Sequence, residues 1–171
     1  MRVLRGRDRV GRRVSLLLPA RFPERLDANT LMRWNVWALG RMGRCPYFQV
    51  YGASIYENFA GFSMMQSLTL NASMPPSMMR ASFHYIQKCA AYRLGGIWVA
   101  NQPKFMSVMW ALVRPFMSAK MRERVHLLGA NTAAFTAEMD ASRLPAEFGG
   151  SLEEDAMAWF DEQCALEAAG H

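Results

Sequence analysis

The stretch that decides the fold is GGIWVANQPKFMSVMWALVRPFMSAKMRERVHLLGAN, residues 95–131. Two glycines open it, and the apolar run 97–100 that follows predicts a buried strand. After Pro103, residues 104–117 carry apolar side chains at helical spacing, and 124–128 predict another strand. Because a helix joins the two strands, we expect a right-handed crossover between parallel neighbours.

The same alternation extends upstream. Residues 14–18 and 49–58 predict two further strands, and 27–42, 62–70 and 77–92 predict helices. Strands separated by helices indicate an α/β fold with a mainly parallel sheet. A chain of 171 residues is long enough for one such domain.

Several motifs in this order resemble the CRAL-TRIO family, especially its animal branch, which contains α-tocopherol transfer protein and cellular retinaldehyde-binding protein. Upstream, GRDRVGRRVSLLL and QVYGASIYENFAGFS resemble the first and second strands of the family. The downstream motifs are Asn101 to Pro103, Arg114 to Met117, Lys120 to Arg124, Val125-His126 and Leu144 to Gly150. The resemblance implies an α/β CRAL-TRIO fold, in which a mainly parallel sheet forms the floor of a hydrophobic pocket. Crossover helices wall this pocket, and a gate helix covers it.

Two features depart from the family pattern. Asn58 stands where the family usually has an aspartate, and residues 71–76 include a few extra positions. We expect a basic lead-in over 1–13, the CRAL-TRIO domain over 14–152 and a helical tail over 153–171. The helical bundle that precedes the domain elsewhere in the family is expected to be absent.

One apolar stripe marks the expected gate helix. Met106, Met109, Trp110 and Val113 fall at i, i+3, i+4 and i+7, so they share one helix face. Periodicity alone favours an ordinary core stripe, whereas the resemblance implies that this face lies over a ligand. The positions that match the pocket of the family elsewhere in the chain are Met32, Asn35, Leu39, Ala53, Leu70, Tyr85 and Ile86.

A second site is expected beside the gate. Lys120 and Arg124 lie one helical turn apart, and Arg93 precedes the neighbouring strand. In α-tocopherol transfer protein the matching basic positions engage phosphoinositide headgroups, so the resemblance implies docking on membranes that contain these lipids. Gly95 replaces a further basic residue of that site. The alternative is a scatter of solvated charges.

Composition narrows the partners. A net charge of +6 and a pI near 9.7 indicate an anionic partner, either nucleic acid or an acidic membrane. The six arginines of residues 1–13 favour a solvated arm, and the aromatic residues do not interleave with basic ones as a nucleic-acid platform requires. We therefore expect no nucleic-acid partner. Fourteen methionines suit either a loose core or a pocket for a flexible apolar molecule.

Cysteine usage and the apolar segments point to the cytoplasm. Cys45, Cys89 and Cys164 are widely spaced and form neither a disulfide framework nor a zinc motif. The apolar run 14–18 is shorter than a signal-peptide core or a membrane span. We expect a cytoplasmic protein that associates peripherally with membranes and needs no cofactor or metal.

Enzymatic chemistry finds little support. The sequence has no G-x-S-x-G elbow, and His84 and His126 fall where structural imidazoles are common. We predict a non-enzymatic carrier that binds a tocopherol-, retinoid- or phospholipid-like molecule and transfers it between membranes. A second hypothesis is a phosphoinositide-reading interaction module without cargo transfer, and a third is an enzyme that turns over a lipid ester.

Overall fold

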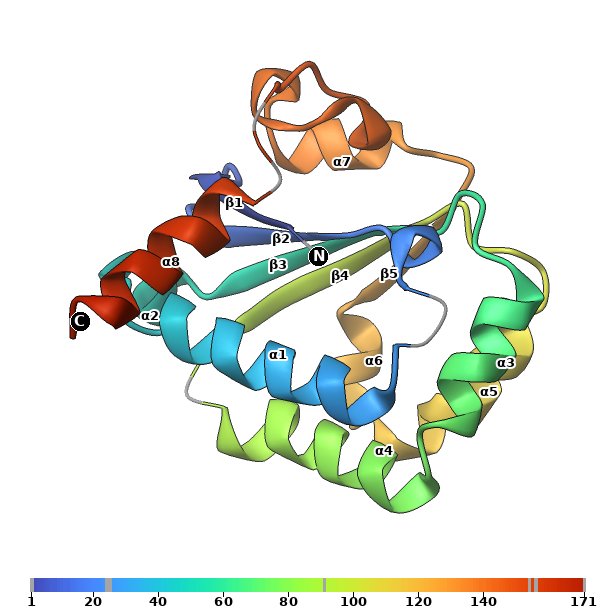
Figure 1. Ribbon diagram of the computed structural model, residues 1–171. Coiled ribbons are helices and arrows are strands. Elements are labelled where there is room, and N and C mark those ends of the chain that lie inside the picture. Colours follow the sequence, from blue (N-terminus) through green and yellow to red (C-terminus); the bar gives the residue numbers. More distant parts are fainter. Residues whose placement is uncertain (1, 24–25, 91, 154, 156, 171) are drawn as a thin grey trace.

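A single five-stranded sheet organises the molecule in the computed structural model, which describes residues 2–23, 26–90, 92–153, 155 and 157–170 (Figure 1). The strands lie in chain order, with β1 antiparallel to β2 and the remaining pairs parallel. This arrangement confirms the expected mainly parallel α/β sheet. The strands are β1 (Arg2–Arg7), β2 (Arg13–Leu17), β3 (Ala53–Asn58), β4 (Leu94–Ala100) and β5 (Val125–Gly129).

Most helices pack against one face of this sheet, and α7 covers the other face (Figure 1). In chain order the helices are α1 (Ala28–Met42), α2 (Pro46–Tyr51), α3 (Met64–Ala72), α4 (Pro76–His84), α5 (Met106–Val113), α6 (Ala119–Glu123), α7 (Ala133–Glu138) and α8 (Ala158–Ala168). Short 3-10 turns occupy Pro19–Arg21, Arg114–Phe116, Ala141–Arg143 and Ala146–Phe148. A π-helical turn, Tyr85–Cys89, continues α4, so the helix expected over 77–92 changes its geometry midway.

The expectation of an irregular basic lead-in over 1–13 is wrong. Val3 and Leu4 of β1 are almost fully buried, whereas Arg5 is exposed and Arg2 and Arg7 are partly exposed. Asp8 closes the hairpin because its carboxylate accepts hydrogen bonds from the backbone N–H groups of Val10 and Arg12. The many arginines of this segment suggested a solvated arm, but Val3 and Leu4 are buried and the segment pairs with β2 as the edge strand of the sheet.

The strand expected over 49–58 is shorter than the sequence suggested. Pro46 starts the short helix α2, which runs to Tyr51. Gly52 then adopts a positive φ of 83°, and a Cβ atom here would lie 1.8 Å from the Arg93 carbonyl oxygen. Only glycine permits this tight turn into β3.

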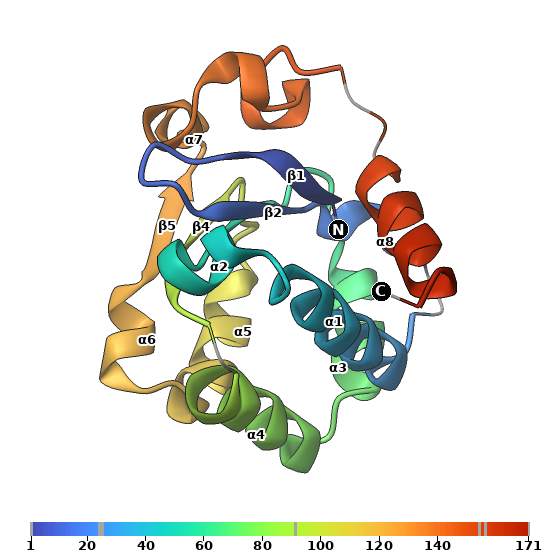
Figure 2. The same ribbon diagram turned by 90° about the vertical axis from the view of Figure 1, so that its left-hand side faces the viewer.

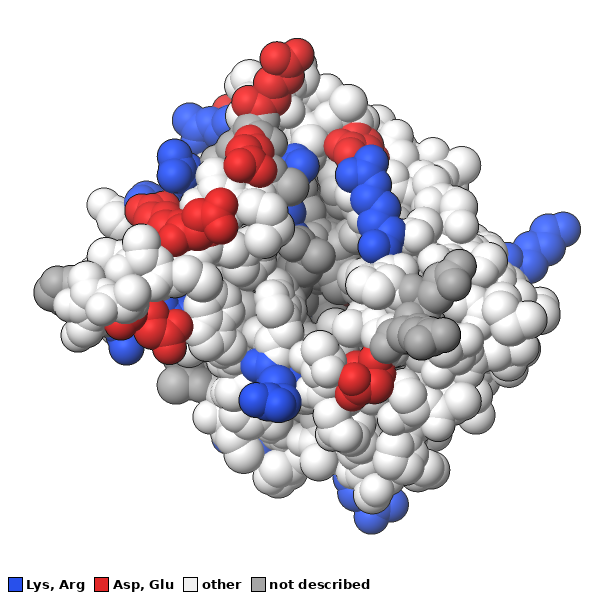
Figure 3. Space-filling model, in the orientation of Figure 1, with Lys and Arg blue, Asp and Glu red and all other residues white. Residues whose placement is uncertain are grey.

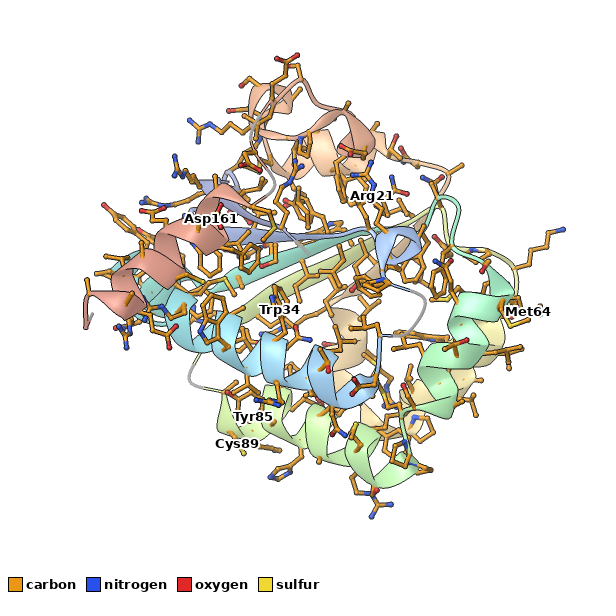
Figure 4. The ribbon with its side chains drawn as sticks, viewed as in Figure 1. Arg21, Trp34, Met64, Tyr85, Cys89 and Asp161 are labelled. Carbon is orange, nitrogen blue, oxygen red and sulfur yellow. The ribbon has the colours of Figure 1, made fainter. Side chains whose placement is uncertain are left out.

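The two sheet faces bury different clusters. On the α7 side, Phe135 packs against Tyr56, whose ring also contacts Trp98. On the opposite side, α8 packs against α1 and β1. There Phe160 contacts Trp34, and the Trp37 indole donates a hydrogen bond to Glu167. Figure 4 places Trp34 on α1 and Asp161 on α8, beside this junction.

Candidate functional site

A cavity of about 360 Å³ lies between the sheet and the helices α1, α4, α5 and α6. Asp27 caps the amino end of α1 by accepting a hydrogen bond from the Thr30 N–H, which fixes where this wall begins. Strand side chains, most of them at alternating positions, form the floor. They are Ser15, Leu17, Ala53, Ile55, Glu57, Leu94, Ile97, Val99, Val125 and Leu127. The volume of the cavity falls within the range of about 300–1,000 Å³ that is usual for small-molecule pockets.

Nine of the residues expected to line a pocket lie on this cavity wall. They come from α1, the start of β3, the π-helical turn and the inner side of α5. These residues are Met32, Asn35, Leu39, Ala53, Tyr85, Ile86, Met106, Trp110 and Val113. The amide N–H of Asn35 is used within α1, where it donates to the Leu31 carbonyl.

Two expected pocket residues lie elsewhere. Leu70 lines a separate small pocket of about 20 Å³ with Phe22 and Phe62. Met109 faces α3, where its sulfur accepts hydrogen bonds from Asn71 Nδ2 at 2.8 Å and Ser67 Oγ at 3.3 Å. Met109 sits at one edge of the apolar stripe, and a stripe of this width is divided between the cavity and the neighbouring helix.

The outer side of α5 is exposed and apolar. Val108 and Leu112 are 63% and 56% exposed, and on α3 Met65 is 71% exposed. Met64 also projects outward from α3 (Figure 4). The two helices lie side by side at one end of the molecule (Figures 1 and 2), so α5, called the gate helix below, has one side on the cavity and another toward solvent.

Sequence reasoning missed most of the floor. Ile55 and Glu57 follow Ala53 at intervals of two, and the same spacing relates Ile97 to Val99. Side chains two apart on a strand point to the same sheet face, so this alternation was the signal that could have found them.

Glu57 is the one charged side chain among the described residues that line the cavity. Burial among apolar neighbours raises the pKa of its carboxyl to about 7, because the charged form loses hydration. Burial likewise raises the pKa of the Tyr92 hydroxyl to about 12. The cavity therefore holds a carboxyl that changes its charge near neutral pH.

A groove next to the cavity gathers the expected basic residues. Arg93, Lys120 and Arg124 line it together with Gln87 and Ser118. The groove measures about 440 Å³ and lies where β4 and β5 begin. This is the end of the sheet that faces the viewer in Figure 2, beside α6. Arg93 and Lys120 are exposed, whereas Arg124 is half-buried.

The cavity and the groove share part of one wall. Ile86, Tyr92, Leu94 and Met121 line both.

On the face drawn in Figure 3, the surface is hollowed near its centre and charged side chains are dispersed around the hollow. Within the described part of the chain, no helix is long and apolar enough to cross a bilayer, and no cluster of metal-ligating side chains occurs.

The chain thus combines an α/β sheet, helices that enclose an apolar cavity, and α5 along one wall of that cavity. A profile of the CRAL/TRIO domain matches residues 1–150. The chain belongs to the CRAL-TRIO family, a family of lipid-binding domains that bind hydrophobic ligands. The match begins at residue 1, which agrees with the inclusion of β1 in the sheet.

Relatives in sequence include the clavesins. Clavesin-1 of Rattus norvegicus is 28% identical over 151 residues, which cover 88% of this chain and 42% of clavesin-1. Clavesin-2 of Homo sapiens is 30% identical over 146 residues, which cover 85% of this chain and 43% of clavesin-2. This chain therefore spans less than half the length of these relatives.

The fold also matches a solved structure. The crystal structure of Sfh5 superposes with a TM-score of 0.65 at 10% identity and covers 92% of this chain and 58% of the Sfh5 chain. At this identity the match shows the shared fold alone.

Proposed function

We propose that this chain binds one hydrophobic small molecule or lipid in the cavity and carries it between membranes, docking through phosphoinositides at the basic groove. The observation that supports this most directly is the shared wall. Ile86, Tyr92, Leu94 and Met121 separate an apolar cavity from a cationic groove by one layer of side chains.

Apolar burial supplies the affinity for the cargo. Covering about 300 Å² of ligand surface at about 25 cal/mol per Å² contributes roughly 7 kcal/mol before the cost of ordering the ligand. Apart from Glu57, polar groups on the wall are few, and several cavity methionines adapt to irregular ligand shapes. The mechanism needs no bond chemistry.

The groove supplies attraction to an anionic surface. Each Lys or Arg near an acidic bilayer contributes about 1 kcal/mol, so Arg93, Lys120 and Arg124 together contribute roughly 3 kcal/mol. An attraction of this size favours reversible contact, as a cytoplasmic carrier that associates peripherally with membranes requires.

Native mass spectrometry tests the carrier function. The chain is expressed in lipid-containing cells, purified without detergent and sprayed intact, and we expect an added mass that equals one apolar molecule. Repeated preparations that carry no such mass, but still bind phosphoinositide vesicles, would instead favour a phosphoinositide-reading module without cargo.

A further inference from the structure

The side-chain amide of Gln87 holds the segment that joins the gate helix to α6. Its Nε2 donates to the Phe116 carbonyl at 2.9 Å, and its Oε1 accepts a hydrogen bond from the Ser118 backbone N–H at 2.7 Å. Nε2 also donates to the Phe83 carbonyl at 2.9 Å within its own helix. One planar amide thus satisfies two backbone groups of the connector 116–118.

This connector contacts both neighbouring helices. Phe116 ends the 3-10 turn that follows the gate helix, and the Ser118 hydroxyl caps α6 by accepting from the Met121 N–H. Between them Met117 is 6% exposed and packs in an apolar cluster with Trp110 and Val113 of the gate helix. The Phe116 ring also stacks on Phe83, with centroids 6.5 Å apart.

Gln87 also lies in the basic groove. It lines this groove with Arg93, Lys120 and Arg124, and the preceding residue, Ile86, lies on the wall shared with the cavity. Its place in a π-helical turn distinguishes this segment from the regular helix before it. Such turns are frequent at functional sites.

We propose that Gln87 is a latch on the gate helix, and that a multiply phosphorylated headgroup in the groove opens it. This inference rests on the proposed docking function and deepens it. The three cations bring phosphate oxygens to the groove, and these oxygens compete for the amide N–H groups of Gln87. Because the amide is planar, a rotation that moves Nε2 away from Phe116 also moves Oε1 away from Ser118.

The consequence is a coupled release. Without the amide, the connector keeps its apolar contacts through Met117 and Phe116 but loses the side-chain hydrogen bonds that fix its backbone. The gate helix then opens more often at its carboxyl end, next to the groove and above the cavity. Gln87 acts here as a positioning residue that converts headgroup binding into gate movement.

Amide hydrogen exchange on the cargo-free chain tests the latch. Gln87→Met removes both hydrogen bonds to the connector, together with the one to Phe83, and keeps a side chain of similar length. We expect exchange in residues 106–118 to rise roughly 5- to 30-fold, as the loss of two modest hydrogen bonds implies. Cys89→Met is the matched control, because it places the same side chain at an exposed position of the same turn, and it should exchange like the parent.

Inositol 1,4,5-trisphosphate, with inositol as its uncharged control, tests the coupling. In the parent, the trisphosphate should raise exchange in 106–118, whereas Gln87→Met should show no further rise. Vesicles of phosphatidylcholine with about 5% phosphatidylinositol 4,5-bisphosphate distinguish a lipid headgroup from a free anion as the trigger.

The outcomes separate this inference from the docking function. Parent-like exchange in Gln87→Met overturns the latch, whatever the vesicles do. Fast exchange in the variant with no response of the parent to trisphosphate or vesicles overturns the coupling. Loss of vesicle binding in Lys120→Ala with Arg124→Ala, measured separately, supports docking even if the latch fails.

Discussion

The sulfur of Met109 lies 2.8 Å from Asn71 Nδ2, so the gate helix is tied to α3 through a residue that does not line the cavity. Trp110, the next residue, lies on the cavity wall. Adjacent residues of the same apolar stripe therefore serve different purposes, and this difference is measurable.

Substitutions at these two positions should separate ligand binding from helix anchoring. Trp110→Ala removes at least about 60 Å² of apolar wall and should weaken binding of the apolar dye Nile red about tenfold or more. Met109→Leu keeps the volume and should leave Nile red affinity within about twofold of the parent, with a stability cost below about 1.5 kcal/mol. Equal losses of affinity in the two variants would contradict this placement of the wall.

The raised pKa of Glu57 predicts a pH-dependent stability. An ordinary glutamate has a pKa near 4.5, and burial raises that of Glu57 to about 7. Between these values the folded state holds a proton that the unfolded chain has released, so stability falls as pH rises from about 4.5 to 7. The contribution of this group to the fall is ~3 kcal/mol.

Glu57→Gln isolates this effect, because the amide cannot ionise. We expect the variant and the parent to have similar urea-unfolding free energies near pH 4.5, and the variant to be more stable at pH 8. A difference that stays constant across this pH range would show that the Glu57 carboxyl does not titrate as its burial implies.

Membrane docking should depend on the positive charges of the basic groove and not on positive charges elsewhere on the surface. Lys120→Ala with Arg124→Ala removes two cations of the groove and should weaken binding to phosphoinositide vesicles roughly 5- to 30-fold in flotation, because each contributes about 1 kcal/mol. Nile red binding should be unchanged. Arg80→Ala with Arg143→Ala removes the same net charge at two exposed positions outside the groove and serves as the control. Equal weakening in both double variants would indicate a diffuse charge effect instead of a site.

The strand β1 should be needed for stability. Leu4 is fully buried in the cluster around Tyr56, so Leu4→Ala should lower the free energy of unfolding by about 2–5 kcal/mol. Arg9→Ala, in the same hairpin, breaks only an exposed ion pair with Asp140 and should cost less than about 1 kcal/mol. Urea unfolding measures both, and a parent-like Leu4→Ala would restore the interpretation of this segment as a solvated arm.

The sequence by itself determined the fold class and most of the helical wall. Apolar runs such as 97–100 and the helical stripe of Met106, Trp110 and Val113 are local patterns. They can be recognised in the sequence because side chains on one face recur at different intervals in strands and in helices. The motifs between residues 95 and 150 then identified the family. The sequence also led us to expect that Arg93, Lys120 and Arg124 lie together, since each flanks a predicted strand or shares a helix turn with another, and these residues line one groove.

Only the tertiary structure decided which side chains face the cavity, which contact a neighbouring helix and which segments join the sheet. Whether Met109 faces the cavity or α3 depends on a few tens of degrees of helix rotation, which packing sets and periodicity does not. Residues 2–7 form a strand because β2 offers an unpaired edge, although their charge suggested a solvated arm. The carboxyl of Glu57 in the cavity and the amide of Gln87 under the gate connector bring together residues far apart in the chain, and such long-range contacts leave no local signature in the sequence.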